Sequence, residues 1–449
     1  MSGTEREKRS TKAVRAALAA LDGAAAGRPL ALALSEALRA EEGLGPQERR
    51  AAATAARGAV RELRRIDLVL AQASKAAGLD LRRTPGHDRT LLRYLALRVS
   101  IEAEAPERPL RELALPGPRR PRSIGDDVLA RVAAHLPPAD ALPLPADPVV
   151  ALGVRRSVPD FLARRLVEDL GPARADAVLA ALNLPARLDL RANRLLATRE
   201  EAAARLADEG VAAAPLLLAP DGLVVADRAG LFGRTHAAGL FELQDEGSQL
   251  IALLCGLRPG ETAIDLCAGS GGKALALAAA VGGQGRVVAC DPMAHRLAEL
   301  PARARRARAQ RIIEMGGAGP SAELVGRADV VLVDAPCSGV GSLRREPDLR
   351  WRLTEKDLDA YPVRQSSILE EASRFVRPEG GRLVYATCSP LRSEGEQVVA
   401  AFLKKHPEYR LDPAEHFLPE SAVEDGFLRS WPDRHGGGAF FAARLSRSR

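Results

Sequence analysis

The sequence is poor in aromatic residues, cysteine and histidine. Aromatic residues make up 3% of the 449 residues, and two of them are tryptophan. The five cysteines form no C-x-x-C pair, and an odd number without a framework argues against disulfides and zinc. The seven histidines are scattered, so we expect no metal. With no apolar run of eighteen residues and no recognisable leader, we expect a cytoplasmic protein that makes no membrane contact.

Basic residues outnumber acidic ones. The net charge is +7, whereas the hydrophobic content of 46% and charged content of 27% are those of a soluble globular protein. A basic chain of this kind favours a polyanionic partner, and we expect nucleic acid. The length predicts two or three domains.

The hydrophobic pattern changes twice along the chain. Residues 1–143 show helical periodicity, including one helix over 49–71, and predict an all-α domain. Residues 144–239 predict a small α+β module, with strands at 188–193 and 216–225, a helix at 200–209, and Ser157 as a helix N-cap. Residues 240–449 alternate strand and helix, which predicts an α/β fold with a mostly parallel, Rossmann-like sheet. Its expected strands lie at 262–266, 286–291, 329–334, 382–387 and 439–445.

A glycine-rich turn follows the first of these strands. After Asp265 it comprises Cys267, Ala268, Gly269, Ser270, Gly271, Gly272 and Lys273. Glycines let a ligand approach the backbone, and the following helix offers N–H groups to an anionic part. A phosphate-binding loop is disfavoured, because Ala274 replaces the Ser or Thr that holds magnesium.

An acidic residue, Asp291, ends the next strand nineteen residues after Gly272. This spacing is typical of a carboxylate that binds ribose hydroxyls. The glycines do not fit G-x-G-x-x-G, so a dinucleotide is disfavoured. S-adenosylmethionine fits better, since it carries a ribose and a carboxylate but no phosphate.

Two cysteine motifs end two further strands, Asp334-Ala-Pro-Cys337-Ser-Gly and Thr387-Cys388-Ser-Pro. Carboxyl ends of parallel strands face one crevice, so we expect the two thiols and Asp334 to lie together. This set suits cytosine C5 methylation, in which a thiolate adds to C6 and a base later removes the C5 proton. From chemistry alone either cysteine could be the nucleophile.

Taken together, these motifs resemble those of the bacterial Sun/Fmu ribosomal RNA cytosine-5 methyltransferases of the Nol1/Nop2/Sun family. Residues 241–249 and 437–445 resemble further motifs of that family, and residues 10–140 resemble its NusB-like RNA-binding domain. The resemblance implies that Cys388 attacks C6 and that Cys337 helps release the product. It also implies that residues 267–273, Asp291 and Asp334 line the S-adenosylmethionine site, with Lys273 orienting Asp334 or the cofactor carboxylate.

The sequence departs from the family pattern at three points: Ser270 replaces the proline of a Pro-Gly-Gly turn, the helix after Asp291 lacks the usual asparagine, and an acid of the expected cofactor site is missing. Where members carry Gly-Asp, whose acid holds the adenine amino group, this chain has Gly316-Gly317. An alternative is therefore an RNA-binding ribosome-assembly or transcription factor with a degenerate methyltransferase domain. A DNA cytosine-5 methyltransferase, with Cys337 as nucleophile, is a third interpretation that leaves Cys388 without a role.

The expected substrate is ribosomal RNA of the small subunit. We expect the protein to be a monomer and to have no obligate protein partner. Arg344, Arg345, Arg350 and Arg352 are expected to contact phosphates near the target base. Trp351, Tyr361 and Phe440 are candidates for stacking on a base, with core packing the favoured role for Phe440. Residues 393–396 (Ser-Glu-Gly-Glu) are expected to form a capping box at the start of a helix.

Overall fold

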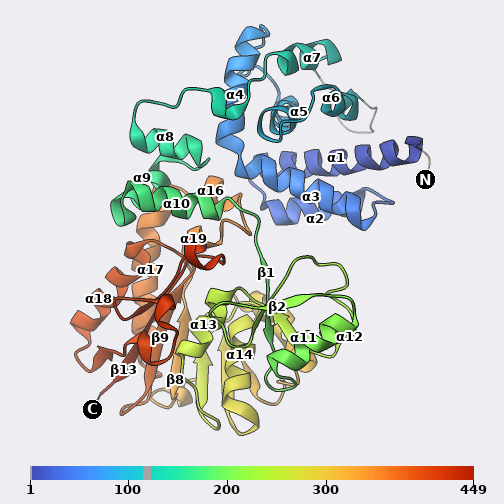
Figure 1. Cartoon of the computed structure of the whole chain (residues 1–449). Coiled ribbons are helices and arrows are strands. Elements are labelled where there is room, and N and C mark those ends of the chain that lie inside the picture. Colours follow the sequence, from blue (N-terminus) through green and yellow to red (C-terminus); the bar gives the residue numbers. More distant parts are fainter. Residues whose placement is uncertain (1–2, 115–122, 449) are drawn as a thin grey trace. The chain divides into compact units, whose positions relative to one another are not determined.

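The computed structural model describes residues 3–114 and 123–448 (Figure 1). The chain divides into two compact units. The first runs to Leu179 and also contains the short segment Glu346–Leu353, whereas the second comprises Ala180–Arg345 and Thr354–Arg449. No helix in the described ranges combines the length and hydrophobicity needed to cross a membrane.

The first unit is helical, as predicted. Its helices up to residue 134 bury small apolar side chains, mostly alanine and leucine, in one core. The helices of the unit are α1 (Gly3–Ala25), α2 (Leu30–Ala40), α3 (Pro46–Arg61), α4 (Leu63–Ala76), α5 (Gly86–Ala96) with a π-helical extension (Leu97–Ile101), α6 (Glu107–Ala114), α7 (Asp126–Ala134), α8 (Pro148–Arg155), α9 (Asp160–Leu170), α10 (Pro172–Leu182, which ends in the second unit) and α16 (Leu349–Arg352).

Two local predictions in this unit are wrong. The expected helix over 49–71 is two helices, because the backbone leaves the helical region at Glu62 (φ −99°, ψ 11°) while both pieces bury the same apolar face. Ser157 is not an N-cap. It has a left-handed backbone (φ 53°), its hydroxyl accepts the Arg64 N–H at 3.0 Å, and Pro159 takes the N-cap position of α9.

The second unit begins with a small antiparallel sheet in the order β2-β3-β1-β4. Its elements are β1 (Leu188–Ala192), α11 (Arg199–Asp208), β2 (Ala213–Pro215), β3 (Gly222–Val225), α12 (Arg234–Ala237) and β4 (Phe241–Leu243). The strand expected over 216–225 is shorter, since the Leu216 N–H bonds to the Gly222 carbonyl across a turn and leaves β3 to start at Gly222.

A nine-stranded sheet forms the rest of this unit, in the order β11-β12-β13-β9-β8-β5-β6-β7, with β10 on β13. Strands β5 (Thr262–Asp265), β6 (Arg286–Cys290), β7 (Ile313–Gly317), β8 (Val330–Asp334) and β9 (Arg382–Thr387) are parallel. The antiparallel edge consists of β10 (Tyr409–Leu411), β11 (Val423–Glu424), β12 (Phe427–Ser430) and β13 (Phe440–Arg447). The predicted fold class is confirmed.

Helices cover both faces of this sheet (Figure 1). Alternate strand residues divide between two cores: Val330 and Leu332 pack with α13 (Glu246–Leu254) and α14 (Gly272–Val281), whereas Val331 and Val333 pack with α17 (Glu355–Ser373) and α18 (Glu396–Lys405). The short helix α15 (Leu300–Arg306) adds Leu300 and Ala304 to the first of these cores, and α19 (Pro432–His435) connects β12 to β13.

The chain order reverses between β5 and β8. From β5 the sheet continues to β6 and β7 on one side and to β8 and β9 on the other. Ligands of open α/β sheets bind at such a switch point, beyond the carboxyl ends of the strands. The residues that follow β5 and β8 are the glycine turn and the first cysteine motif, so the topology brings them to one crevice.

Candidate active site

The glycine turn joins β5 to α14. Gly271 is the N-cap of α14 and has a left-handed backbone (φ 86°), which favours glycine. A Cβ there would also lie 2.2 Å from Leu300 Cδ1, so only glycine fits. The Ala268 N–H donates to the Cys290 carbonyl at 2.8 Å, which attaches the turn to the end of β6.

Asp291 lies against this turn, as the spacing predicted. Its carboxylate accepts the Gly269 N–H at 3.0 Å and the Met293 N–H at 2.8 Å, and the residue is buried. Each carboxylate oxygen has a second lone pair, so the same group can also accept from a ligand hydroxyl.

Lys273 and Asp334 form a close ion pair from α14 to the end of β8. Lys273 Nζ lies 2.6 Å from Asp334 Oδ2 and 3.3 Å from Ser248 Oγ. Burial alone would lower the pKa of Lys273, but the adjacent Asp334 carboxylate outweighs burial and raises the pKa. The lysine is therefore a fixed positive charge that orients Asp334.

Asp265, at the end of β5, is a site residue that the sequence reasoning did not single out. It is fully buried, and neither carboxyl oxygen finds a well-formed hydrogen bond among the described residues. Burial, reinforced by the charge of Asp334, raises its pKa to about 7. A buried, unsatisfied carboxyl group next to a glycine turn is ready to accept hydrogen bonds from a cationic ligand.

The two predicted cysteines meet. Cys337 Sγ and Cys388 Sγ are 3.2 Å apart, at the ends of β8 and β9. Burial raises the pKa of the other three thiols, Cys255, Cys267 and Cys290. Cys388 differs: the hydrogen bond from the Cys337 thiol lowers its pKa, and the same bond raises the pKa of Cys337.

The surroundings of the two sulfur atoms are asymmetric. At Cys388 the contact with Cys337, the Arg345 guanidinium and the Ser342 hydroxyl outweigh burial and the Asp334 charge and lower the pKa, whereas at Cys337 burial and the Glu394 carboxylate add to the effect of Cys388 and raise it. Arg345 is held by Asp245 and donates to Ser342 Oγ at 2.9 Å. A negative charge is therefore favoured at Cys388 over Cys337.

The capping box predicted for residues 393–396 is wrong. Glu394 instead holds the two cysteine loops together. Its fully buried carboxylate accepts the Ser338 N–H (2.8 Å) and hydroxyl (2.5 Å), the Ser389 hydroxyl (2.8 Å) and Gln365 Nε2 (3.0 Å). Helix α18 instead begins after Gly395, without a side-chain cap. Ser338 and Ser389 directly follow the two cysteines, so Glu394 fixes the distance between the sulfur atoms.

Two family models match the chain. "16S rRNA methyltransferase RsmB/F" matches residues 252–446, and the "ferredoxin-like domain" of RsmF/B-like methyltransferases matches residues 158–230. A "Probable ribosomal RNA small subunit methyltransferase B" of Synechocystis sp. is 33% identical over 310 residues, which are 67% of this chain and 69% of that protein. The chain belongs to the RsmB/F family of 16S rRNA methyltransferases.

Other relatives agree with this membership. The protein of the same description from Bacillus subtilis is 32% identical over 67% of this chain and 68% of its own length. A "Putative methyltransferase" of Mycobacterium tuberculosis is 43% identical over 46% of each chain. The fold, apart from family membership, is also that of the solved structure "PH0851", with a TM-score of 0.78 at 24% identity and 97% of this chain and 99% of that chain covered.

The departure from the family pattern at Gly316-Gly317 has a local structural counterpart. A Cβ at Gly316 would lie 2.3 Å from Cys290 Sγ, so a side chain does not fit there. Gly317 has a left-handed backbone (φ 64°), and its carbonyl accepts the Asp291 N–H at 2.9 Å. The backbone of β7 thus positions Asp291 without an acidic side chain of its own.

Of the four arginines that follow the first cysteine motif, two are not available for the predicted phosphate contacts. Arg344 is buried and donates to the carbonyls of Pro185 and Gly436, and Arg350 is fully buried and donates to the Ser157 carbonyl at 3.1 Å. The prediction that Arg344 and Arg350 contact phosphates is therefore wrong. Motif spacing could not reveal this, because their partners lie far away in the sequence.

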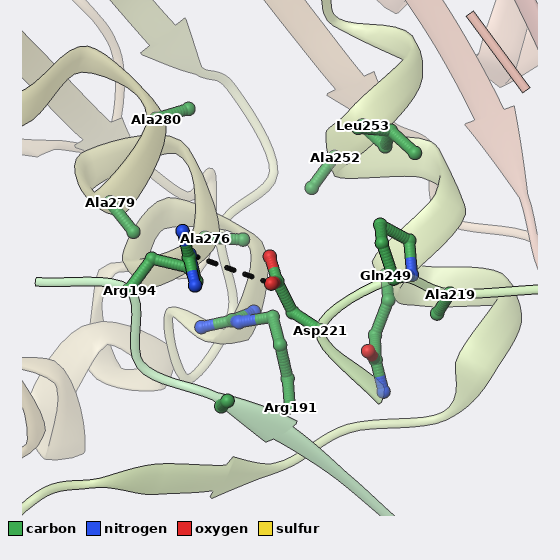
Figure 2. A pocket seen from close by; sticks show the side chains of 12 residues that line it. Arg191, Arg194, Ala219, Asp221, Gln249, Ala252, Leu253, Ala276, Ala279 and Ala280 are labelled. Carbon is green, nitrogen blue, oxygen red and sulfur yellow. Dashed lines mark ion pairs between the residues drawn. The ribbon is translucent and has the colours of Figure 1, made fainter. Parts of the chain in front are cut away.

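A hollow of about 250 Å³ lies between the small sheet and helices α13 and α14 (Figure 2). Arg191 lines it and donates to the Gly272 carbonyl at 3.0 Å, and burial lowers the pKa of Arg191 to about 10. Arg194 and Asp221 face each other at 3.6 Å. None of the predicted site residues lines this hollow, but Arg191 connects the small sheet to the first residue of α14.

Proposed function

We propose that the chain methylates C5 of a cytosine in small-subunit ribosomal RNA, with S-adenosylmethionine as donor. The observation that carries the proposal is the 3.2 Å contact between Cys337 and Cys388 beside the Lys273–Asp334 ion pair. Cytosine C5 becomes nucleophilic only after a thiolate adds to C6, and the lowered pKa of Cys388 favours that thiolate.

The residues around the glycine turn suit this donor. S-adenosylmethionine carries a sulfonium and an ammonium against one carboxylate, so it is a net cation. Asp265, Asp291 and Asp334 outnumber Lys273, the cation beside them, which gives a complementary charge. The turn and the α14 N-terminus would hold the carboxylate, with Asp291 at the ribose. When bound, the donor supplies an electrophilic methyl group.

In the proposed reaction, Cys388 Sγ forms a bond to C6 and the ring electrons move toward C5 and N3. Asp334, oriented by Lys273, would accept a hydrogen bond from the cytosine amino group, and the Lys273 ammonium would offset the negative charge that develops on the ring. After C5 gains its methyl group, the Cys337 sulfur, having given its own proton to solvent, takes the C5 proton. The C6–S bond then breaks and its electron pair returns to Cys388 Sγ, which restores one thiol proton to the sulfur pair.

The substrate and the setting complete the proposal. A cytosine must be unpaired or flipped out to expose C6, so the target is a single-stranded or opened segment of the RNA. We propose that residues 1–143 and 144–239 are RNA-binding domains, that residues 240–449 carry the chemistry, and that the protein acts as a cytoplasmic monomer.

Methyl transfer from radiolabelled S-adenosylmethionine to 16S rRNA tests the proposal. Cys388→Ala is expected to abolish transfer, whereas Cys337→Ala is expected to accumulate a protein–RNA adduct that survives denaturing electrophoresis. Cys255→Ala, at a buried cysteine outside the site, is the matched control. Turnover by Cys388→Ala, with adduct formation lost in Cys337→Ala, would contradict the assignment.

The Gly316-Gly317 departure favours a second candidate, an RNA-binding assembly or transcription factor without methyltransferase activity. Titration calorimetry with S-adenosylmethionine separates the two. Absence of binding at millimolar donor, with RNA binding retained, supports the factor, whereas saturable binding supports the enzyme.

A further inference from the structure

The helical unit contains a cavity of about 400 Å³ that is separate from the active site. It is lined by α1, α3, α4 and α5 together with the segment Glu346–Leu353, which belongs to this unit by its contacts. Leu21, Val60 and Leu63 form apolar parts of its wall. That volume is large enough for one nucleotide or one long side chain.

One of the two tryptophans of the chain, Trp351, lines this cavity. Its indole Nε1 donates to the Val60 carbonyl at 2.8 Å, which fixes the ring plane. Three residues earlier, Asp348 accepts the Leu30 N–H at 3.1 Å and Arg352 Nε at 3.0 Å. The aromatic surface is therefore presented by an anchored segment.

Four arginines and one carboxylate line the cavity: Arg28, Arg89, Arg93 and Arg352, with Asp348. Arg28 is paired with Glu36, Arg93 with Asp67 at 2.8 Å, and Arg352 with Asp348. Arg89 is exposed, and no carboxylate of the described residues pairs with it. An aromatic ring beside unneutralised arginine favours a ligand with a flat ring and a phosphate.

We propose that this cavity binds one unpaired nucleotide of the RNA substrate. The base stacks on Trp351, and the adjoining phosphates contact Arg89 and Arg352. The inference rests on the proposed function for the identity of the partner as RNA. It adds a nucleotide-binding site in the unit that does not contain the cysteines, and so gives the helical domain a defined contact with the substrate.

Tryptophan fluorescence tests the stacking contact in the full-length protein. A single-stranded RNA 10-mer of mixed sequence is expected to quench the emission of the wild-type protein, and Trp351→Leu is expected to lose the quench. Stacking of one base predicts that Trp351→Leu weakens binding by about tenfold, while Trp351→Phe, which keeps an aromatic ring, loses less than about threefold. Equal losses in the two variants would contradict stacking.

A pair of charge reversals tests the phosphate contact, measured by fluorescence anisotropy of the labelled 10-mer. Arg89→Glu is expected to weaken binding by about tenfold or more, and the weakening should shrink at high salt. Arg82→Glu, at a fully exposed arginine of the same unit outside the cavity, is the matched control and should lose about twofold or less. Equal losses in both variants would overturn the proposal.

Further measurements separate this inference from the proposed function. A polyglutamate peptide that quenches Trp351 as strongly as RNA would overturn the assignment to RNA in favour of an acidic protein partner. If Cys388→Ala keeps methyl transfer but RNA still quenches Trp351, the reaction scheme fails and the cavity proposal stands. If wild-type methyl transfer is normal and RNA never quenches Trp351, the cavity proposal alone fails.

Discussion

Replacement of Glu394 by glutamine tests whether one buried carboxylate sets the geometry of the cysteine pair. Glu394 Oε1 accepts the two serine hydroxyls, and Oε2 accepts the Ser338 N–H and Gln365 Nε2. Glutamine can keep its oxygen toward the Ser338 N–H and Gln365, because the backbone N–H can only donate and the Gln365 amide is held as a donor by the Pro336 carbonyl. The two hydroxyls must then rotate and accept from the new amide NH₂.

The expected cost follows from this rearrangement. All four bonds survive in number but lose the negative charge, and a bond to a charged group contributes about 1.5–3 kcal/mol against about 1 for a neutral one. We therefore expect Glu394→Gln to lower the free energy of unfolding by about 2–8 kcal/mol. Glu394→Ala, which leaves buried donors without any acceptor, should cost more.

Function should fall further than stability. Small displacements of reacting groups reduce rates by about 100-fold, so methyl transfer by Glu394→Gln should fall by that order even where the protein is folded. Urea unfolding and amide hydrogen exchange in peptides that cover residues 334–342 and 385–395 measure the stability, and radiolabel transfer to RNA measures the rate.

Glu370→Gln is the matched control, because Glu370 is a partly exposed carboxylate on α17 that pairs with Lys405 and His406. It should cost less than about 1 kcal/mol and leave methyl transfer unchanged. If Glu394→Gln behaves like this control in both assays, the inference that Glu394 holds the cysteine loops is refuted.

Three further predictions concern titration and charge at the same site. Cys337→Ala removes the hydrogen bond that lowers the Cys388 pKa, so the pH midpoint for iodoacetamide alkylation of Cys388 should move upward; an unchanged midpoint contradicts the thiol–thiolate pair. The pKa of Asp265 is raised from 3.8 to about 7, so the folded state takes up a proton and the free energy of unfolding should fall as pH rises from 4 to 7. Asp265→Asn should abolish that fall and gain up to about 4 kcal/mol above pH 7 in urea unfolding; a parallel pH profile contradicts it. Lys273→Met should destabilise the protein by about 1–3 kcal/mol, less than for a fully enclosed pair because the Asp334 side chain is 30% exposed, and added Asp334→Asn should recover part of the loss.

The sequence predicts the parallel centre of the sheet well, because β5, β6, β8 and β9 are short apolar runs followed by turn residues. It does not predict β7, which has the exposed Met315 in its middle and ends in Gly317. This strand carries too little apolar pattern of its own to be recognised, and the neighbouring strand β6 determines its place.

The residues of the active site divide in the same way. The sequence predicts that the glycine turn, Asp291, Lys273, Asp334 and both cysteines belong together, because each lies just beyond a strand end of one sheet. Glu394 and the partners of Arg350 were missed for a shared reason: their hydrogen bonds join loops that are 56 and 193 residues apart. Such contacts leave no periodic or compositional signal.

The distinction between the two cysteines can be argued from the structure without reference to relatives. Chemistry alone leaves their roles interchangeable, since each cysteine lies at a strand end and the two thiols are hydrogen-bonded to each other. The electrostatics are not symmetric, because Arg345 and Ser342 help to lower the pKa of Cys388 against burial and the charge of Asp334, while at Cys337 Glu394 adds to the contact with Cys388 and to burial, which raise the pKa. Glu394 therefore has two effects: it holds both loops, and it disfavours a negative charge at Cys337. A single carboxylate thus links the geometry of the pair to the identity of the proposed nucleophile.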